Sequence, residues 1–228
     1  MAHTDPSAVS ADPGAPAEAE ILVIVAHPEL EQSRANRRLL KAARALQDKG
    51  PAGRVAVRDL YALYPDYLID IAVEQAALKA AKLVVWQHPI RWYSMPPLLK
   101  LWLDDVLTFG WAYGPEGDAL RGKDLWLVAS TGGPEDSYRP DSYNRYFFDA
   151  FLPPYEQTAA LCGMRFLPPL VFHGAHKASE AELAAHVETY VRRLADYPAW
   201  PEIDLVEDCV ECVVPSNARP ADRVMETA

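Results

Sequence analysis

The chain has 228 residues, half of them apolar, with a formal net charge of −10 and a pI near 5.0. This length and apolar fraction suit one ordinary domain with a sizeable core. The acidity argues against a non-specific nucleic-acid surface or a polybasic membrane anchor. No apolar stretch approaches the roughly 20 residues of a membrane span, and no secretory signal pattern opens the sequence. We therefore expect a cytoplasmic protein.

The two ends differ in composition from the middle of the chain. Residues 1–20 are dominated by Ala, Pro, Asp, Glu and Ser, so they predict a disordered tail. Residues 201–228 turn acidic and lose helical periodicity, and no role is predicted for them. The pair Cys209 and Cys212 lies in this extension and not at a strand-to-helix turn, so a thioredoxin-like role is not expected. With Cys162, three cysteines are too few for a disulfide framework, which favours a reducing compartment.

Between the ends, residues 21–200 alternate five times between a strand pattern and a helix pattern. Short apolar or alternating runs predict strands at 21–26, 54–60, 83–86, 123–130 and 164–172. Amphipathic spacing predicts helices over about 34–49, 71–81, 96–109, 147–161 and 183–194. Such alternation is typical of an α/β three-layer sandwich with a parallel sheet and helices on both faces. Five strands in about 180 residues favour the flavodoxin-like order 2-1-3-4-5.

That topology also predicts where a ligand binds. The loops after strands one, three and four begin at His27, Pro89 and Ser130, and they should meet at the carboxyl edge of the sheet. The third loop carries a guanidinium and two aromatic rings, Arg91, Trp92 and Tyr93. A flat ligand is expected there.

The other two loops offer groups suited to a phosphate and to a hydrogen-bonding ring. Ser33 and Asn36 stand where the first helix begins, and a helix N-terminus with Arg34 beside it attracts a phosphate. The simpler interpretation is that Ser33 only caps the helix. The run Ser130-Thr131-Gly132-Gly133 lets backbone approach a ligand, although such a run is also an ordinary turn. Neither a dinucleotide fingerprint nor a Walker loop is present.

Several motifs together resemble one known family. They are His27-Pro28, Ser33-x-x-Asn36, WQHPIRWYSMPPLLKLWLD at 86–104, GWAYG at 110–114 and STGG at 130–133. This combination resembles the flavodoxin-like NAD(P)H:quinone oxidoreductases, over about residues 21–200. Within that family it is similar to the ancillary proteins of glutathione-regulated potassium-efflux systems.

The resemblance implies an FMN cofactor, in preference to FAD. Its phosphate would lie on His27, Ser33, Arg34, Ala35 and Asn36. Its isoalloxazine ring would contact Pro89, Ile90, Arg91, Trp92 and Tyr93, and the ring's polar edge would bond Ser130, Thr131, Gly132 and Gly133. NADPH or NADH would donate a hydride and a quinone would accept it in a separate step, which implies ping-pong kinetics.

A tyrosine and a histidine assist flavin reduction in relatives such as DT-diaphorase. Tyr138 stands at the matching tyrosine position, but Asn144 occupies the histidine's place and cannot carry a proton near neutral pH. Tyr138 is therefore the one catalytic candidate, and a loop tyrosine packed against its neighbours is the alternative. Arg91 departs from the glutamine of this family, so it either stabilises a reduced flavin or forms a surface ion pair.

The remaining expectations concern histidines and partners. His88 is interpreted as a satisfied histidine at a strand end, and His173 and His176 lack further donors at metal-ligand spacing, so no metal site is predicted. The large apolar residues of the 96–109 helix, and the resemblance, favour a homodimer. The alternative function is a regulatory subunit that activates a membrane antiporter from the inner face of the membrane.

Overall fold

The computed structural model describes residues 19–52 and 54–203. Most of the predicted tail at 1–20, and Cys209 and Cys212 in the extension, lie outside the described residues. Within the described part of the chain, no helix combines the length and the apolar character that a membrane crossing requires.

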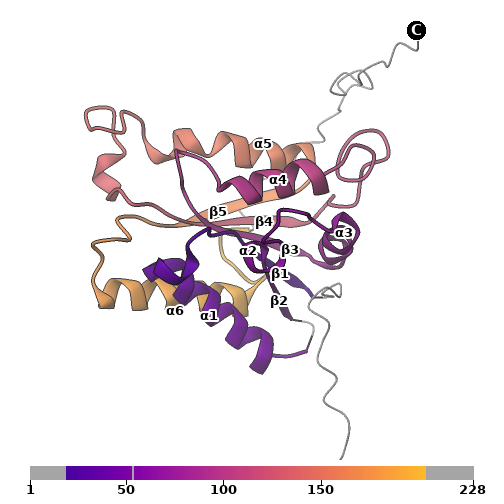
Figure 1. The fold of residues 1–228 in the computed structure, drawn as a ribbon, viewed down its shortest axis with the longest axis horizontal. Helices are drawn as coiled ribbons and strands as arrows, with labels where there is room; N and C mark the ends of the chain where they lie inside the picture. The colour runs from indigo at the N-terminus through magenta and orange to yellow at the C-terminus, as the bar shows by residue number, and fades with distance from the viewer. Residues whose placement is uncertain (1–18, 53, 204–228) are drawn as a thin grey trace, which may run out of the picture.

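Five parallel strands form one sheet in the order β2-β1-β3-β4-β5, which confirms the predicted flavodoxin-like topology (Figure 1). The strands are β1 (Ile21–Val25), β2 (Val55–Asp59), β3 (Leu83–Pro89), β4 (Asp124–Ser130) and β5 (Arg165–Phe172). β1 and β4 are buried along their whole length, as expected for central strands covered on both faces. β5 holds Pro168 and Pro169, and its register with β4 shifts between Trp126 and Val128. Proline is tolerated there because β5 is an edge strand.

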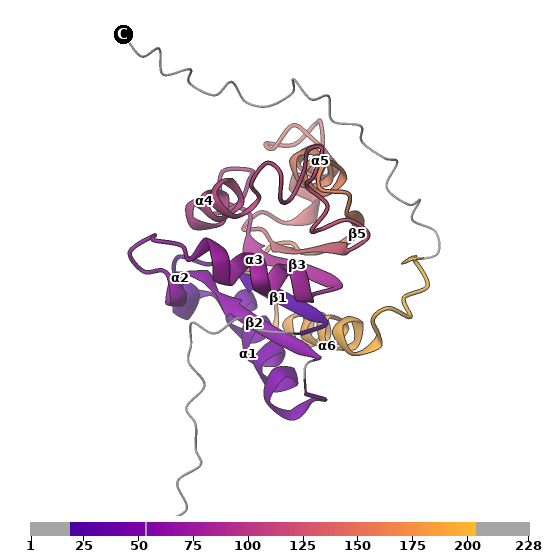
Figure 2. The ribbon, with the colours of Figure 1, turned by 90° about the vertical axis from the view of Figure 1, so that its right-hand side faces the viewer.

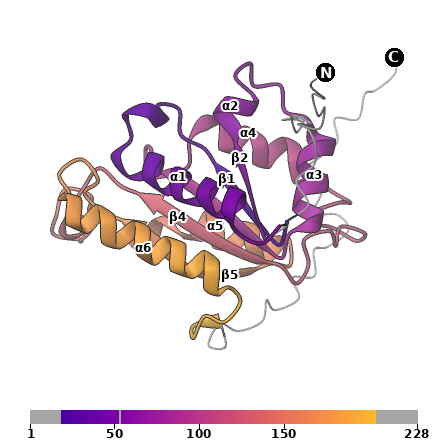
Figure 3. The ribbon, with the colours of Figure 1, turned by 90° about the horizontal axis from the view of Figure 1, so that it is seen from below.

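The helices cover both faces of the sheet. On one face lie α1 (Arg34–Lys49) and α6 (Glu180–Asp196), side by side in Figure 3. On the other lie α3 (Ile71–Ala80), α4 (Pro97–Val106) and α5 (Pro153–Leu161), as Figures 1 and 2 show. The short helix α2 (Leu60–Leu63) follows β2 directly. Three 3₁₀ turns complete the described elements, namely η1 (Leu30–Gln32), η2 (Glu135–Ser137) and η3 (Phe148–Phe151).

Two predictions about the helices are wrong. The single helix expected over 147–161 is divided into η3 and α5, because Pro153 and Pro154 cannot continue a helix from the preceding turn but can begin a new one. The other is the premise that α4 carries surplus apolar surface, which is one ground for the expected homodimer. Leu98, Leu99 and Trp102 are instead fully buried in the protein's own core, together with α3, α5 and the sheet.

A buried ion pair fastens α3 to β2 and α4. Glu74 accepts hydrogen bonds from Arg58 Nε and from the Tyr64 hydroxyl, both at 2.6 Å, and from Trp102 Nε1 at 2.9 Å. Burial, and next the bonded carboxylate, raise the pKa of Tyr64 to about 12. Every oxygen of the Glu74 carboxylate is therefore bonded, which makes burial of this charge tolerable.

Candidate active site

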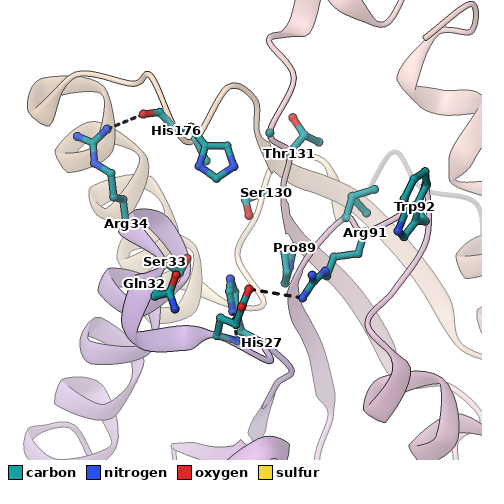
Figure 4. A pocket seen from close by; sticks show the side chains of 14 residues that line it. His27, Gln32, Ser33, Arg34, Pro89, Arg91, Trp92, Ser130, Thr131 and His176 are labelled. Carbon is teal, nitrogen blue, oxygen red and sulfur yellow. Dashed lines mark hydrogen bonds and ion pairs between the residues drawn. The ribbon is translucent and has the colours of Figure 1, made fainter.

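A cleft of about 510 Å³ lies at the carboxyl edge of the sheet. It is lined by the loops that follow β1, β3 and β4, as topology predicts, and by the loop between β5 and α6 (Figure 4). Ten predicted cofactor residues line it: His27, Ser33, Arg34, Pro89, Ile90, Arg91, Trp92, Ser130, Thr131 and Gly132. The predicted convergence of three loops is therefore present.

The start of α1 forms one end of the cleft. The Ser33 hydroxyl oxygen accepts the Asn36 N–H at 3.1 Å, so Ser33 does cap the helix. The cap does not exclude anion binding, because the other N–H groups of the first turn have no partner within the helix. Arg34 lies beside them and also lines the cleft.

Ala35 and Asn36 lie beneath the cleft and do not line it. Ala35 packs against Phe172 and Leu183. Asn36 is fully buried, and its Nδ2 donates to Ser130 Oγ at 2.8 Å, which ties the start of α1 to the end of β4. A role for these two residues in phosphate binding stays a prediction, and it would run through their backbone.

A buried chain of hydrogen bonds supports this arrangement. Gln87 Nε2 donates to the backbone oxygen of Asn36 at 3.2 Å, and the Tyr190 hydroxyl donates to Gln87 Oε1 at 2.9 Å. The chain thus runs from α6 through β3 and α1 to Ser130. Such a connected network fixes the relative positions of the loops.

Charges of both signs line the cleft. Arg34 pairs with Glu180 at 2.9 Å. It also donates to the backbone oxygen of His176 at 3.3 Å (Figure 4). Arg91 lies 3.9 Å from a carboxylate oxygen of Glu29. The surface ion pair that was the alternative for Arg91 is therefore present, with both partners lining the cleft.

The imidazole ring of His27 is neutral and has one N–H to donate. Burial, and next the charge of Arg91, lower the pKa of His27 below its usual value. Its Nδ1 accepts the Glu29 N–H at 3.1 Å, so we assign the ring proton to Nε2. Since His27 lines the cleft, this Nε2–H can donate to a ligand there.

The aromatic turn after β3 has a strained backbone. Arg91 and Ser94 exchange two backbone hydrogen bonds of 2.9 and 3.1 Å, and between them Trp92 and Tyr93 have φ of +49° and +64°. Positive φ at both central positions is the pattern of a type I′ turn, which usually holds Asn-Gly. Trp92 is 93% exposed, so no burial of its own offsets this strain. Strain of this kind gathers at ligand sites.

A smaller cavity of about 210 Å³ adjoins the cleft and shares Ile90 and Trp92 with it. Two predicted cofactor residues that do not line the main cleft, Tyr93 and Gly133, line this smaller cavity. Tyr138, Tyr143 and Asn144 line it as well. A Cβ on Gly133 would lie 2.7 Å from the Tyr143 hydroxyl and 2.8 Å from Ser137 Oγ. The exposed Tyr143 side chain can move away, but Ser137 is buried and its Oγ is bonded to Pro134 and Asn144, so a side chain at position 133 would displace a fixed hydroxyl.

Tyr138 is buried and lines the smaller cavity. Burial raises the pKa of Tyr138, and a hydrogen bond with the Thr131 side chain opposes that rise. Its ring packs against Phe148, Phe151 and His173. Asn144 connects two loops. Its Nδ2 donates to Ser137 Oγ at 2.9 Å, and its Oδ1 accepts from the Tyr93 hydroxyl at 3.4 Å.

His88 lies outside both cavities. It is buried and stacks on Tyr155, with ring centroids 5.7 Å apart, and its Nδ1 lies 3.0 Å from the Pro89 oxygen. Burial lowers the pKa of His88 to about 4. Its Nε2 is buried without a partner among the described residues, so the expectation of a fully satisfied histidine holds for one ring nitrogen only.

Sequence reasoning missed one wall of the cleft, formed by Ala175 and His176. The signal was available, because every loop at the carboxyl edge of a parallel sheet is a candidate and this loop follows β5. It also missed Glu29 and Gln32 beside the start of α1.

With the geometry in place, comparison with known proteins gives the family. The family model described as "Flavodoxin-like fold" matches residues 19–194, and the chain belongs to this family. A relative from Citrobacter koseri is named glutathione-regulated potassium-efflux system ancillary protein KefF. It is 46% identical over 182 residues, which cover 80% of this chain and 97% of the relative.

Solved structures agree on the fold and carry different names. General stress protein 14 from Treponema denticola, in complex with FMN, is 39% identical with a TM-score of 0.71, over 77% of this chain and 98% of that one. An NADPH-quinone reductase from P. pentosaceus is 27% identical with a TM-score of 0.67, over 76% and 96%. A Streptomycin violaceusniger chain titled a thermophilic tryptophan halogenase is 43% identical with a TM-score of 0.68, over 74% and 95%.

Proposed function

We propose that the cleft binds FMN and that the protein uses it to reduce quinones with NAD(P)H. The observation that carries the proposal is the single cleft that unites a helix N-terminus, an aromatic turn and a glycine turn. Its volume of about 510 Å³ suits a ligand of this size. The FMN in a neighbour that is 39% identical, and the name of another neighbour as a quinone reductase, support the same conclusion.

Each part of the cleft suits one part of the cofactor. The first turn of α1, with Arg34 and the Nε2–H of His27, offers donors and positive charge to the phosphate. Trp92 offers a flat apolar face, and the turn at Gly132 offers backbone donors. When bound, FMN would supply hydride chemistry, first accepting from NAD(P)H and then passing to a quinone. We propose that Tyr138, which lines the smaller cavity, donates a proton to the acceptor.

The first test is the visible absorption spectrum of the purified protein reconstituted with FMN, before and after anaerobic addition of NADPH. We expect a bound flavin spectrum that bleaches, and whose colour returns when a quinone is added. Absence of flavin binding would refute the cleft assignment. Binding without bleaching would refute the reductase and leave an electron carrier.

We also propose that a second copy of the chain covers the exposed aromatic residues beside the cavities, which are Trp92, Tyr143, Tyr146 and Phe147. Light scattering coupled to size exclusion measures this directly, and a monomer that still binds FMN fully would refute it.

The second candidate function is a regulatory subunit of a membrane antiporter, with the protein cytoplasmic and held at the inner face of the membrane by that partner. Its support is the name of the relatives, which are 46% identical over nearly their whole length. Co-purification with an antiporter expressed from the same genome tests it, and a lack of any association would leave the enzyme alone.

A further inference from the structure

Ser130 ends β4 and lines the cleft, although the residue is buried (Figure 4). Its backbone oxygen accepts the Ile90 N–H at 2.8 Å, so that oxygen is already bonded. The hydroxyl group is the part of Ser130 that can bond a ligand. Whether this hydroxyl donates or accepts in the cleft depends on the buried hydrogen bonds behind it.

The far end of the buried chain has a fixed direction. Gln87 bonds the backbone oxygen of Asn36 at 3.2 Å, and because a carbonyl oxygen only accepts, this end of the Gln87 amide is Nε2. The other end is then Oε1, which also only accepts, so the Tyr190 hydroxyl donates to it at 2.9 Å. All three residues are fully buried. The start of α1 is therefore held to β3 and α6 by bonds that have one possible orientation.

The near end of the chain is the bond between Asn36 and Ser130. Asn36 Nδ2 donates to Ser130 Oγ at 2.8 Å, and Asn36 Oδ1 has no partner among the described residues. A serine hydroxyl has one proton and two lone pairs, and the Asn36 amide occupies one lone pair. Within the described part of the chain, the Ser130 hydroxyl proton has no acceptor. This proton is therefore available to a ligand in the cleft.

We propose that Asn36 fixes the Ser130 hydroxyl as a hydrogen-bond donor to the riboflavin part of FMN. The inference rests on the proposed function, because it concerns the cofactor of the same cleft. The sheet register places Ser130 opposite Pro89, at the base of the aromatic turn. Asn36 itself is fully buried and does not line the cleft. Its side chain is thus a positioning group that acts through Ser130, and not a contact of the phosphate.

A donor of fixed direction suits the chemistry of an oxidised flavin. The isoalloxazine ring presents carbonyl oxygens and unprotonated nitrogens, which are acceptors, and the ribityl hydroxyls accept as well. A serine hydroxyl that could turn either way would lose rotational freedom when it bonds such a ligand. Because Asn36 already directs the Ser130 proton toward the cleft, that cost is reduced before the ligand arrives.

The first test measures the affinity of the cofactor-free protein for riboflavin, which lacks the phosphate, by quenching of flavin fluorescence at pH 8. In Ser130→Ala we expect riboflavin to bind about tenfold more weakly, because one hydrogen bond is lost. FMN should lose the same factor. A loss that appears with FMN but not with riboflavin would place the contact at the phosphate and overturn the proposal.

Two variants of Asn36 separate direction from packing. In Asn36→Asp the introduced carboxylate can only accept, so Ser130 must turn its proton inward, and we expect the same tenfold loss of about 1.4 kcal/mol. The helix dipole at the first turn of α1 keeps this carboxyl group ionised. Asn36→Leu removes the amide but adds no acceptor, so Ser130 keeps its proton for the ligand and the loss should stay within about twofold. A purely structural role for Asn36 predicts at least as large a loss with leucine.

The direction of the bond is also tested without cofactor and without any change at position 36. In ¹⁵N-labelled protein, the side-chain amide protons of Asn36 are assigned through its backbone signals. We expect one of them to move upfield in Ser130→Ala, because Nδ2 loses its acceptor. An Asn36 amide signal that is the same in both proteins would show that Nδ2 does not donate to Ser130, and would overturn the proposal.

Gln75→Glu is the matched control. Gln75 Nε2 donates to Thr108 Oγ1 at 3.2 Å, so this variant makes the same change from donor to acceptor beside a hydroxyl, but outside both cavities. It should leave the affinity for riboflavin unchanged. An unaltered affinity in Ser130→Ala, or a loss in Asn36→Leu as large as in Asn36→Asp, would overturn the positioning role alone. Failure of the unaltered protein to bind FMN would overturn the proposed function and the positioning role together.

Discussion

Replacing Trp92 by asparagine should make the cofactor-free protein more stable and should lower the affinity of the protein for FMN. Trp92 has φ of +49°, a conformation that costs an ordinary residue about 1–2 kcal/mol and that asparagine tolerates better. Since the Trp92 side chain is 93% exposed, the substitution removes almost no burial. We expect the free energy of unfolding to rise by about 1 kcal/mol, which is roughly 2–4 °C in Tm for a domain of this size.

The assay is urea unfolding of the protein without cofactor, together with titration of FMN. The midpoint should rise with an unchanged slope, because the amount of surface exposed on unfolding does not change. Loss of one aromatic face should weaken FMN binding by about tenfold, equivalent to about 1.4 kcal/mol.

Phe147→Asn is the matched control for the Trp92 variant. Phe147 is also an exposed aromatic residue, 60% accessible, but its φ is −62°, so there is no strain to relieve. We expect no gain in stability from this change. The reasoning fails if Trp92→Asn is no more stable than the unaltered protein, or if Phe147→Asn gains as much.

Three further predictions follow from buried groups and from close approach. Because the pKa of His88 falls from 6.5 to about 4 on folding, the unfolded chain binds more protons in that range, and about 3 kcal/mol of stability should be lost as the pH falls through it. His88→Phe should reduce the loss seen in urea unfolding at successive pH values, and an unchanged acid limb would contradict this. Glu74→Ala leaves Arg58 buried and unpaired, so it should cost about 3–5 kcal/mol in the same assay, and a cost below about 1 kcal/mol would count against the buried pair. Gly133→Ala should raise the FMN dissociation constant more than Gly132→Ala, whose Cβ meets only His176, at 3.3 Å, and the reverse order would refute the close-approach argument.

The sheet order and the three predicted loops followed from local pattern alone. Apolar runs of strand length alternate with helices of period 3.6, and a right-handed crossover leaves few arrangements for such a chain. The order of β1 to β5, and the meeting of the loops at His27, Pro89 and Ser130, needed no knowledge of side-chain contacts. This part of the structure is therefore predictable from one sequence.

The orientation of single polar side chains is not predictable in this way. Asn36 at the third position of α1 can face a ligand or the core, and its burial depends on Gln87 and Ser130, which are 51 and 94 residues away. The bond between Thr131 and His173 likewise joins residues 42 apart. Periodicity carries no information on such pairs, because they form only when the sheet has brought two loops together.

The conformation of the aromatic turn illustrates why the strain at the site depends on the whole fold. The residues Trp92 and Tyr93 would disfavour a type I′ turn in a free peptide, so the sequence gives no signal for it. The turn is enforced from both sides. β3 enters it from the centre of the sheet, and α4 leaves it packed into the core through Trp102, whose Nε1 is bonded to Glu74. Strain of this kind persists only where the surrounding structure fixes both ends. The rigidity of the core around Glu74 is therefore a condition for the exposed position of Trp92 at the cleft.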